Sequence, residues 1–290
     1  MLQWNTLVHT VATAITTGTT QELWPFLASS VEVRTNFAGY GRGAEGVELL
    51  CCPAARWPLC KLNVESLLFN DTQATFDVLA LHAIRRDTPH FHFVQYGLRC
   101  ALKLSENRIT AITMDLRWFD GNTEILSPWL PLAHCLTADD GVQAPAADND
   151  SQAIRSVIAQ FAWNLDFGGE GCKAQLLPEV RTVDPYHGGT FCGADNWLRA
   201  IANDLDQEAF LQHTLRIFQI QTDGTTAYVA AGRLEPNRIG SRSISMDNYF
   251  ADWFTAIYAF SLEQCSGRWM ISALTITKKI LQIPALENMM

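Results

Sequence analysis

The chain lacks the features that would place it in a membrane or on a nucleic acid. No apolar run reaches the roughly 18–20 residues that a membrane-spanning helix needs. The first residues contain no basic start followed by an apolar block, as a signal peptide would. The formal net charge is −9, whereas nucleic acids and anionic lipid surfaces bind basic faces. We therefore expect a cytoplasmic protein with neither a nucleic-acid nor a membrane partner.

Motifs that bind cofactors or metals are also missing. There is no Gly-x-Gly-x-x-Gly after a strand pattern, no phosphate-binding loop and no Gly-x-Ser-x-Gly elbow. The eight cysteines form no Cys-x-x-Cys pair and have no zinc spacing with histidine, so they are typical of small buried residues in a reducing compartment. His90 and His92 would share one strand face, but no third ligand is identifiable. We expect no cofactor and no metal.

What the chain does contain is an internal repeat. The tetrapeptide Glu-Val-Arg-Thr occurs at residues 32–35 and again at 179–182. A Gly-Ala pair that would open a helix follows each copy, at Gly43 and at Gly193. Each half then shows two strand patterns around a short turn and ends in a long apolar hairpin. The total of 290 residues also suits two domains.

A stretch with few apolar residues separates the two copies. Residues 137–150 contain four Asp, one Val and no aromatic residue, so the segment can bury little and predicts a solvated linker. The predicted organisation is therefore a first unit over 1–136, a linker over 137–150 and a second unit over 151–290.

Hydrophobic spacing in the second copy predicts helices at its start. Apolar residues within 154–165 recur at i, i+3, i+4 and i+7, which indicates an amphipathic helix with Asp150 or Ser151 as its N-cap. Two glycines, at 168 and 169, would end this helix. A short helix or turn would follow, and Asp195 would cap a third helix.

Strand patterns fill the rest of the second copy. Alternating apolar residues over 215–221, 225–234, 254–262 and 268–280 indicate four strands joined in part by tight hairpin turns. Helices followed by a run of antiparallel strands predict an α+β fold. The first copy follows the same plan, with a third helix that Pro53 cuts short.

These segments, in this order, resemble the nuclear-transport-factor-2-like superfamily, and within it the polyketide-cyclase SnoaL-like branch. The likeness covers most of 150–283 and, more loosely, 5–126. Three segments near the start carry it: the end of an Asp-containing helix at Asn164–Gly168, an acidic residue before a strand at Leu177–Val180, and a helix-opening glycine at Gly193. Three later segments add to it: a His-containing strand at Gln212–Leu215, an Asp-Gly hairpin at Asp223–Ala227 and a final strand at Arg268–Ile271.

The resemblance implies the architecture of each copy. Each would be a cone-shaped α+β unit with about three N-terminal helices packed on a curved antiparallel sheet, and with a pocket between them. Units of this kind often pair through their sheets, so we expect an intrachain pseudo-dimer. A further homodimer stays open. The expected partner is a small hydrophobic ligand, bound without a cofactor.

In such a pocket the resemblance implies acid–base chemistry. Asp166 and His213 match the family's positions in the second copy. Imidazole exchanges a proton near neutrality because its unperturbed pKa is about 6.5, and a neighbouring carboxylate would orient it. The alternative is structural: His213 would cover a strand start and Asp166 would hold the turn after a helix.

The first copy departs from this pattern. Cys60 or Lys61 stands where His213 would be, and residues 16–18 (Thr-Thr-Gly) stand where the aspartate would be. We therefore expect the first unit to lack the pair. His82 lies on an apolar strand face of that copy, where a core histidine with satisfied hydrogen bonds is the first interpretation.

Five further residues of the second copy are candidates for the same site. Tyr186, in the loop over 184–189, could hold a substrate carbonyl, although an exposed turn is the alternative. The other four are candidates for binding the ligand, with an ion-paired arginine and core packing as the alternatives: Asp184, Arg233, Tyr258 and Trp197.

The resemblance implies a cofactor-free isomerase, cyclase or dehydratase acting on a small hydrophobic carbonyl compound in the second unit. His213 and Asp166 would be its acid–base pair, assisted by Tyr186. Two other functions stay open, because a fold does not determine a function. One is a non-catalytic small-molecule-binding protein, and the other is an interaction module that uses a sheet face.

Overall fold

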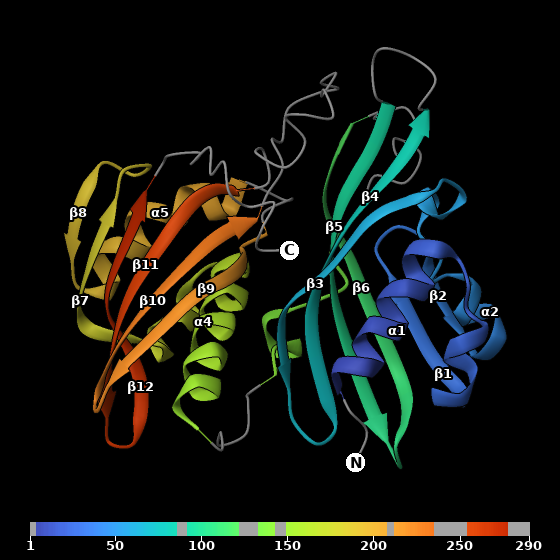
Figure 1. The fold of residues 1–290 in the computed structure, drawn as a ribbon, viewed down its shortest axis with the longest axis horizontal. Helices are drawn as coiled ribbons and strands as arrows, with labels where there is room; N and C mark the ends of the chain where they lie inside the picture. Colours follow the sequence, from blue (N-terminus) through green and yellow to red (C-terminus); the bar gives the residue numbers. More distant parts are fainter. Residues whose placement is uncertain are drawn as a thin grey trace. The chain divides into compact units, whose positions relative to one another are not determined.

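The computed structural model describes residues 4–85, 92–121, 133–142, 149–207, 212–234 and 254–277. The chain divides into two compact units, the first made mainly of residues up to 147 and the second mainly of those after it. Figure 1 colours the first unit from blue to green and the second from yellow-green to red. Each unit has its own six-stranded sheet and apolar core, which confirms the predicted tandem of two α+β units. Their pairing as a pseudo-dimer stays a prediction.

The first unit begins with a helix and a short strand pair and ends in four long strands. Its elements, with η for a 3-10 helix, are α1 (Trp4–Thr17), η1 (Gln21–Phe26), β1 (Leu27–Thr35), β2 (Gly39–Arg42), α2 (Gly43–Glu48), η2 (Pro53–Arg56), β3 (Leu59–Phe69), β4 (Gln73–Arg85), β5 (His92–Ser105) and β6 (Arg108–Gly121).

The second unit repeats this order. Its elements are α4 (Asp150–Asp166), η5 (Glu170–Ala174), β7 (Leu176–Asp184), β8 (Gly189–Cys192), α5 (Ala194–Gln207), β9 (Thr214–Asp223), β10 (Thr226–Leu234), β11 (Phe254–Cys265) and β12 (Arg268–Thr277). Within the predicted linker, η4 (Ala138–Asp140) forms a turn that the Thr137 and Asp140 side chains cap. Residues 143–148 of that linker lie outside the described residues.

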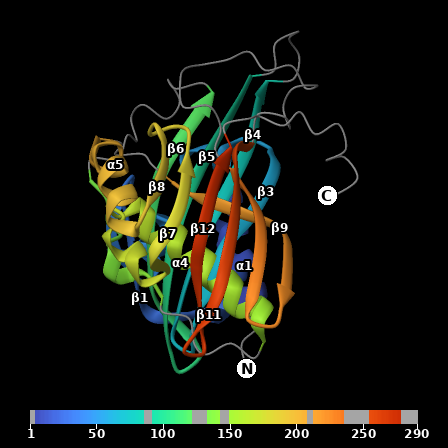
Figure 2. The same ribbon diagram turned by 90° about the vertical axis from the view of Figure 1, so that its left-hand side faces the viewer.

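The two sheets have the same strand order and one parallel pair each. The orders are β2-β1-β6-β5-β4-β3 and β8-β7-β12-β11-β10-β9. The first strand of each unit pairs in parallel with the last, whereas the other pairs are antiparallel. Figure 2 looks onto the second unit, where β7, β12 and β11 run side by side. The sheets are therefore mixed, whereas the sequence predicted antiparallel ones.

The strand that the resemblance predicted from Leu177–Val180 is present as β7, whereas the hairpin that it forms with β8 was not predicted. Because this hairpin precedes α5, the second unit does not place all of its helices before its strands. The buried positions of β7 include Thr182 and Asp184, so an apolar alternation is hard to see in its sequence. The strand β8 has only four residues. The main partner of β7 is β12, the last strand of the unit, so the residues next to β7 in sequence do not reveal this pairing.

Strand pairing shows that the repeated tetrapeptides are not structurally equivalent. Leu27 pairs with Ile109, and Leu176 pairs with Ile271. Three residues further along each last strand, Ile112 pairs with Val33, whereas Leu274 pairs with Thr182. Val33 therefore corresponds to Thr182, two positions away from its match in the sequence repeat. Because side chains alternate along a strand, a shift of two preserves which residues face the core.

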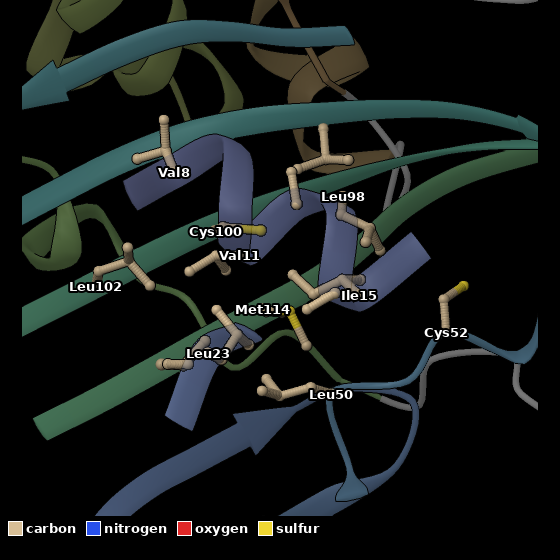
Figure 3. Packing of buried hydrophobic residues seen from close by; sticks show 14 of the residues in the cluster. Val8, Val11, Ile15, Leu23, Leu50, Cys52, Leu98, Cys100, Leu102 and Met114 are labelled. Carbon is tan, nitrogen blue, oxygen red and sulfur yellow. The ribbon is translucent and has the colours of Figure 1, made fainter. Parts of the chain in front are cut away.

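Helices cover one face of each sheet and form its core. In the first unit, Val8, Val11 and Ile15 of α1 pack towards Leu98 and Met114 of the sheet (Figure 3). In the second unit, α4 contributes a corresponding row of buried apolar side chains: Ile154, Ile158, Phe161 and Leu165. Burying each large apolar side chain stabilises the fold by roughly 1.5–3 kcal/mol. The sheet face under the helices is called the inner face below.

The ends of α4 partly follow the prediction. Its N-cap is Asn149, whose side chain accepts the Gln152 amide at 2.9 Å, so the predicted caps Asp150 and Ser151 lie inside the helix. Gly168 and Gly169 follow the helix with φ of 90° and 76°. Glycine adopts this left-handed region without strain, which confirms the predicted stop.

None of the eight cysteines forms a disulfide, and all of them lie in the described residues. Cys52, Cys100 and Cys172 are buried, as predicted for small apolar residues, whereas Cys60 and Cys192 are exposed. Among the described helices, none combines the length and the apolar character needed to cross a bilayer.

His82 is a buried core histidine of the first unit. Its Nδ1 lies 3.0 Å from the Trp57 carbonyl, which can only accept, so Nδ1 donates. Its Nε2 lies 3.1 Å from the Tyr96 hydroxyl, and the two rings are stacked with centroids 5.6 Å apart. Burial lowers the pKa of His82 from 6.5, because the apolar surroundings disfavour the charged ring.

We expect the free energy of unfolding to fall as the pH drops below 6.5 towards the lower folded-state pKa of His82. In that range the unfolded state binds more protons than the folded state. Urea midpoints measured at about pH 7.5 and about pH 5.5 should therefore differ less for His82→Gln than for the wild type. His9, exposed on α1, provides the control His9→Gln, which should behave like the wild type. Equal acid sensitivity of His82→Gln and the wild type would contradict the assignment.

Candidate functional site

Asp166 and His213 lie in direct contact in the second unit. Asp166 is the last residue of α4, and His213 directly precedes β9. The His213 Nδ1 atom lies 2.5 Å from Asp166 Oδ1, and the backbone amide of His213 donates to the same carboxylate at 2.7 and 3.0 Å. The Asp166 side chain is fully buried, and that of His213 is 7% exposed. A carboxylate only accepts, so Nδ1 carries the proton of this bond.

A tyrosine ring packs against the histidine of this pair. The edge of one ring faces the other between Tyr258 and His213, with centroids 6.5 Å apart. Tyr258 is 3% exposed and continues a row of buried aromatic rings. We call this row the aromatic strip, and it consists of Tyr258, Phe260, Phe161 and Trp197. Its successive centroids lie 5.7 to 6.0 Å apart.

Strand register places Arg233 on the same sheet face. Arg233 of β10 lies opposite Leu215 of β9 and Ala256 of β11. Residues directly opposite one another on antiparallel strands point to the same side, and Leu215 and Ala256 belong to the core. Arg233 therefore projects from the inner face, next to the strand that carries Tyr258.

Asp184 and Trp197, two predicted ligand-binding residues, are bonded to each other. Asp184 ends β7 and is 1% exposed, and its Oδ2 accepts the Trp197 indole N–H at 3.0 Å. The same oxygen lies 2.8 Å from the Nδ1 atom of His187, and Oδ1 accepts the Tyr186 amide at 3.0 Å. His187 was not predicted as a site residue. The spacing Asp-x-x-His at a turn was the signal that could have identified it.

The ring of Tyr186 is 47% exposed on the β7–β8 turn. This exposure favours the alternative interpretation of an exposed turn residue. The role of Tyr186 in holding a substrate carbonyl stays a prediction.

The corresponding positions of the first unit follow from the strand pairs. In the first unit, Val33 pairs with Ile112, which pairs with Leu102 on its other side. In the second unit, Thr182 pairs with Leu274, which pairs with Phe260. Leu102 thus corresponds to Phe260. The same strand pairs give the other counterparts in the first unit. Cys100 corresponds to Tyr258, Val78 to Arg233, Val64 to Leu215 and Thr35 to Asp184.

By the same register His213 corresponds to Leu62, two residues before Val64. The sequence comparison had placed Cys60 or Lys61 there, because it could not see how β3 pairs with β4. When the buried residues of α1 are aligned with those of α4, Thr16 corresponds to Asp166. Thr16 belongs to residues 16–18, which the sequence analysis placed at the position of the aspartate. The first unit thus has neither residue of the pair.

A thiol lies close to the pair without taking part in proton transfer. Cys172 is fully buried and donates to the Phe161 carbonyl at 3.4 Å. Burial, and then the negative charge of Asp166, raise the pKa of this thiol well above 9.0. Cys172 therefore stays protonated at neutral pH.

No group of three metal-ligating side chains occurs within the described ranges. His90 and the side chain of His92 lie outside them, so the pair considered above is not part of the described structure.

The chain matches no known family model and no curated protein. Among solved structures, it is similar to an NTF-2 like protein of unknown function from Shewanella oneidensis, with 12% identity over 44% of this chain and 98% of that one, at a TM-score of 0.34. A domain of unknown function with a cystatin-like fold from Nostoc punctiforme shares 15% identity over 50% of this chain and 85% of that one, at 0.38.

A protein provisionally named a ketosteroid isomerase, from Shewanella frigidimarina, shares 17% identity over 43% of this chain and 94% of that one, at a TM-score of 0.32. Likenesses at this level say nothing about activity.

We expect the proton on His213 Nδ1 to give a far-downfield NMR signal, because it is held by a buried carboxylate. In Asp166→Asn this signal should move upfield, and the midpoint of the ring titration should fall because a neighbouring negative charge is lost. Asp150→Asn, at the other end of the same helix, is the control. An unchanged signal and midpoint in Asp166→Asn would show that the contact is absent in solution.

Proposed function

We propose that the second unit is a cofactor-free acid–base enzyme that isomerises, cyclises or dehydrates a small hydrophobic carbonyl compound. Asp166 and His213 form its acid–base pair. The observation that carries this proposal is a difference between two copies of one fold. At corresponding positions, the second unit has Asp and His where the first has Thr16 and Leu62.

The difference between the two units supports a catalytic role for Asp166 and His213, because the fold does not need polar residues at these two positions. Burying a carboxylate beside an imidazole carries a desolvation cost that the contact offsets only with good geometry. The first unit builds the same strand order with a hydroxyl and an aliphatic side chain at these two places. Residues that are costly to bury and unnecessary for the fold are characteristic of functional sites.

The contact prepares the imidazole for proton transfer. With Nδ1–H donated to Asp166, the neutral ring has its lone pair on Nε2, which is the atom that accepts a proton. The carboxylate also stabilises the imidazolium that forms, without taking the proton itself. The ring can therefore remove a proton from the carbon next to a carbonyl and return it to another atom of the same molecule, so no oxidant or reductant is needed.

The neighbouring side chains suit an apolar substrate with one polar group. The aromatic strip and the aliphatic residues of the inner face surround the pair with apolar groups. In such surroundings each hydrogen bond to a developing oxyanion is stronger than in water. Tyr258 and Arg233 have the donors to stabilise that oxygen, and Asp184, Trp197 and Tyr186 would line the neighbouring end of the site.

The test uses variants that carry the residues of the first unit. Asp166→Thr and His213→Leu reproduce a pair of residues with which this fold is already built. The probe is a β,γ-unsaturated cyclohexenone, whose isomerisation to the conjugated enone is followed by absorbance. We expect each variant to remain folded and to lose about 10²–10⁴-fold in kcat, the usual contribution of general acid–base catalysis.

His82→Gln, in the first unit, is the control and should keep the wild-type rate. Equal rates in the wild type and in Asp166→Thr would exclude the pair from the reaction. A wild-type protein that binds such ketones, seen by NMR, without converting any of them would instead support the ligand-binding alternative.

A further inference from the structure

The turn between β7 and β8 contains a second Asp–His pair. Oδ2 of Asp184 lies 2.8 Å from the Nδ1 atom of His187, three residues further along the chain. The carboxylate side chain is 1% exposed and the imidazole 20% exposed. The ring is thus more accessible to solvent than that of His213, which is 7% exposed.

Asp184 is held from several sides. Its Oδ1 accepts the Tyr186 amide, and its Oδ2 accepts the Trp197 indole N–H, each at 3.0 Å. Trp197 is 1% exposed and belongs to α5, which packs beside β7 and β8 (Figure 1). A buried carboxylate with three donors around it has a fixed orientation.

This geometry sets the tautomer of His187. A carboxylate only accepts, so the Nδ1 atom of His187 is the donor, and in the neutral ring Nε2 then carries the lone pair. A free histidine is not restricted in this way. The ring is therefore prepared to accept a proton at Nε2, as is that of His213.

The turn alone does not require this pair. Thr35, the counterpart of Asp184 in the first unit, closes the β1–β2 turn through its hydroxyl, which accepts the Ala38 amide at 2.8 Å. Residues 36–38 of that turn include no histidine. A threonine thus performs the structural task, whereas the aspartate adds the bonds to His187 and Trp197. Neither pair has a counterpart at the corresponding positions of the first unit, whose own Asp–His contact, between Asp115 and His134 at 3.3 Å, lies elsewhere in that unit.

The two pairs are connected through one part of the core. Trp197, bonded to Asp184, is one end of the aromatic strip, and Tyr258, packed against His213, is the other. Asp184 also ends a strand that lies two strands away from Tyr258, a separation of about 10 Å at the usual strand spacing.

We propose that His187 is a second acid–base group of the second unit and that Asp184 is its positioning residue. This inference rests on the proposed function for its substrate class. Moving a double bond next to a carbonyl requires one group to take a proton from carbon and another to give a proton to oxygen. The two histidines, one neutral and one protonated, supply these transfers. The ring that took the proton from the α-carbon then gives it to the γ-carbon, and the other ring takes its proton back from the oxygen. Both rings return to their starting forms, so atoms and electrons balance.

The first experiment measures the tautomer of His187 by the ¹⁵N shifts of its ring in the full-length protein. The wild type should show Nδ1–H, and Asp184→Thr should lose this preference while the β7–β8 hairpin amides keep their signals. Asp184→Thr is a matched variant because Thr35 closes the corresponding turn. A mixed tautomer in the wild type, or an Nδ1–H preference that survives in Asp184→Thr, overturns the positioning role.

The second experiment follows isomerisation of the same β,γ-unsaturated cyclohexenone over a range of pH. His187→Gln and Asp184→Thr should each lower kcat by about tenfold or more and remove one limb of the pH profile, whereas His9→Gln should match the wild type. Activity that is lost in Asp166→Thr but kept in His187→Gln overturns this inference and leaves the proposed function standing. A wild-type protein without turnover overturns both.

Discussion

The parallel pairing of the first strand of each unit with its last strand governs how the other strands of that unit are arranged. It joins Leu27 to Ile109 in one unit and Leu176 to Ile271 in the other. A parallel pair requires a long crossover, and here the crossover contains the remaining strands of the sheet. The first strand consequently lies inside the sheet, with the short β2 or β8 at its outer side. In the second unit this arrangement brings Asp184 to the same sheet as Tyr258, although 74 residues separate them in sequence.

The two units share one fold but carry different side chains on the inner face of the sheet. In the first, Leu62, Val78 and Cys100 occupy positions that hold His213, Arg233 and Tyr258 in the second. The first unit does contain a buried histidine, but its ring bonds to Trp57 and Tyr96 and its pKa is lowered. In the second unit, His187 lies against Asp184 and His213 against Asp166. The buried His82 of the first unit thus has neutral hydrogen-bond partners, whereas the buried His213 of the second unit lies against a carboxylate.

Much of the secondary structure followed from local patterns. The 3.6-residue spacing in α4, the glycines after it and the turn residues between long antiparallel strands are all signals between near neighbours in sequence. The start of β7 was indicated only by the family resemblance, and β8 was missed. Local patterns did not identify β7 because its pairing with β12 is non-local and because two of its buried positions are polar. The repeated tetrapeptide indicated the duplication correctly, but in a register that the strand pairs move by two residues.

Apolar periodicity and turn residues act over a few positions, so the amino-acid sequence was enough to predict two copies of an α+β unit. It also singled out Asp166 and His213, through a family resemblance. Which residues meet depends on the three-dimensional arrangement. Examples are the contact of Asp166 with His213 across 47 residues, the bonds of Asp184 to Trp197 and His187, and the pairing of Leu62 with Ala80. Contacts of this kind depend on strand register and helix placement, and many sequences with the same local pattern allow more than one register.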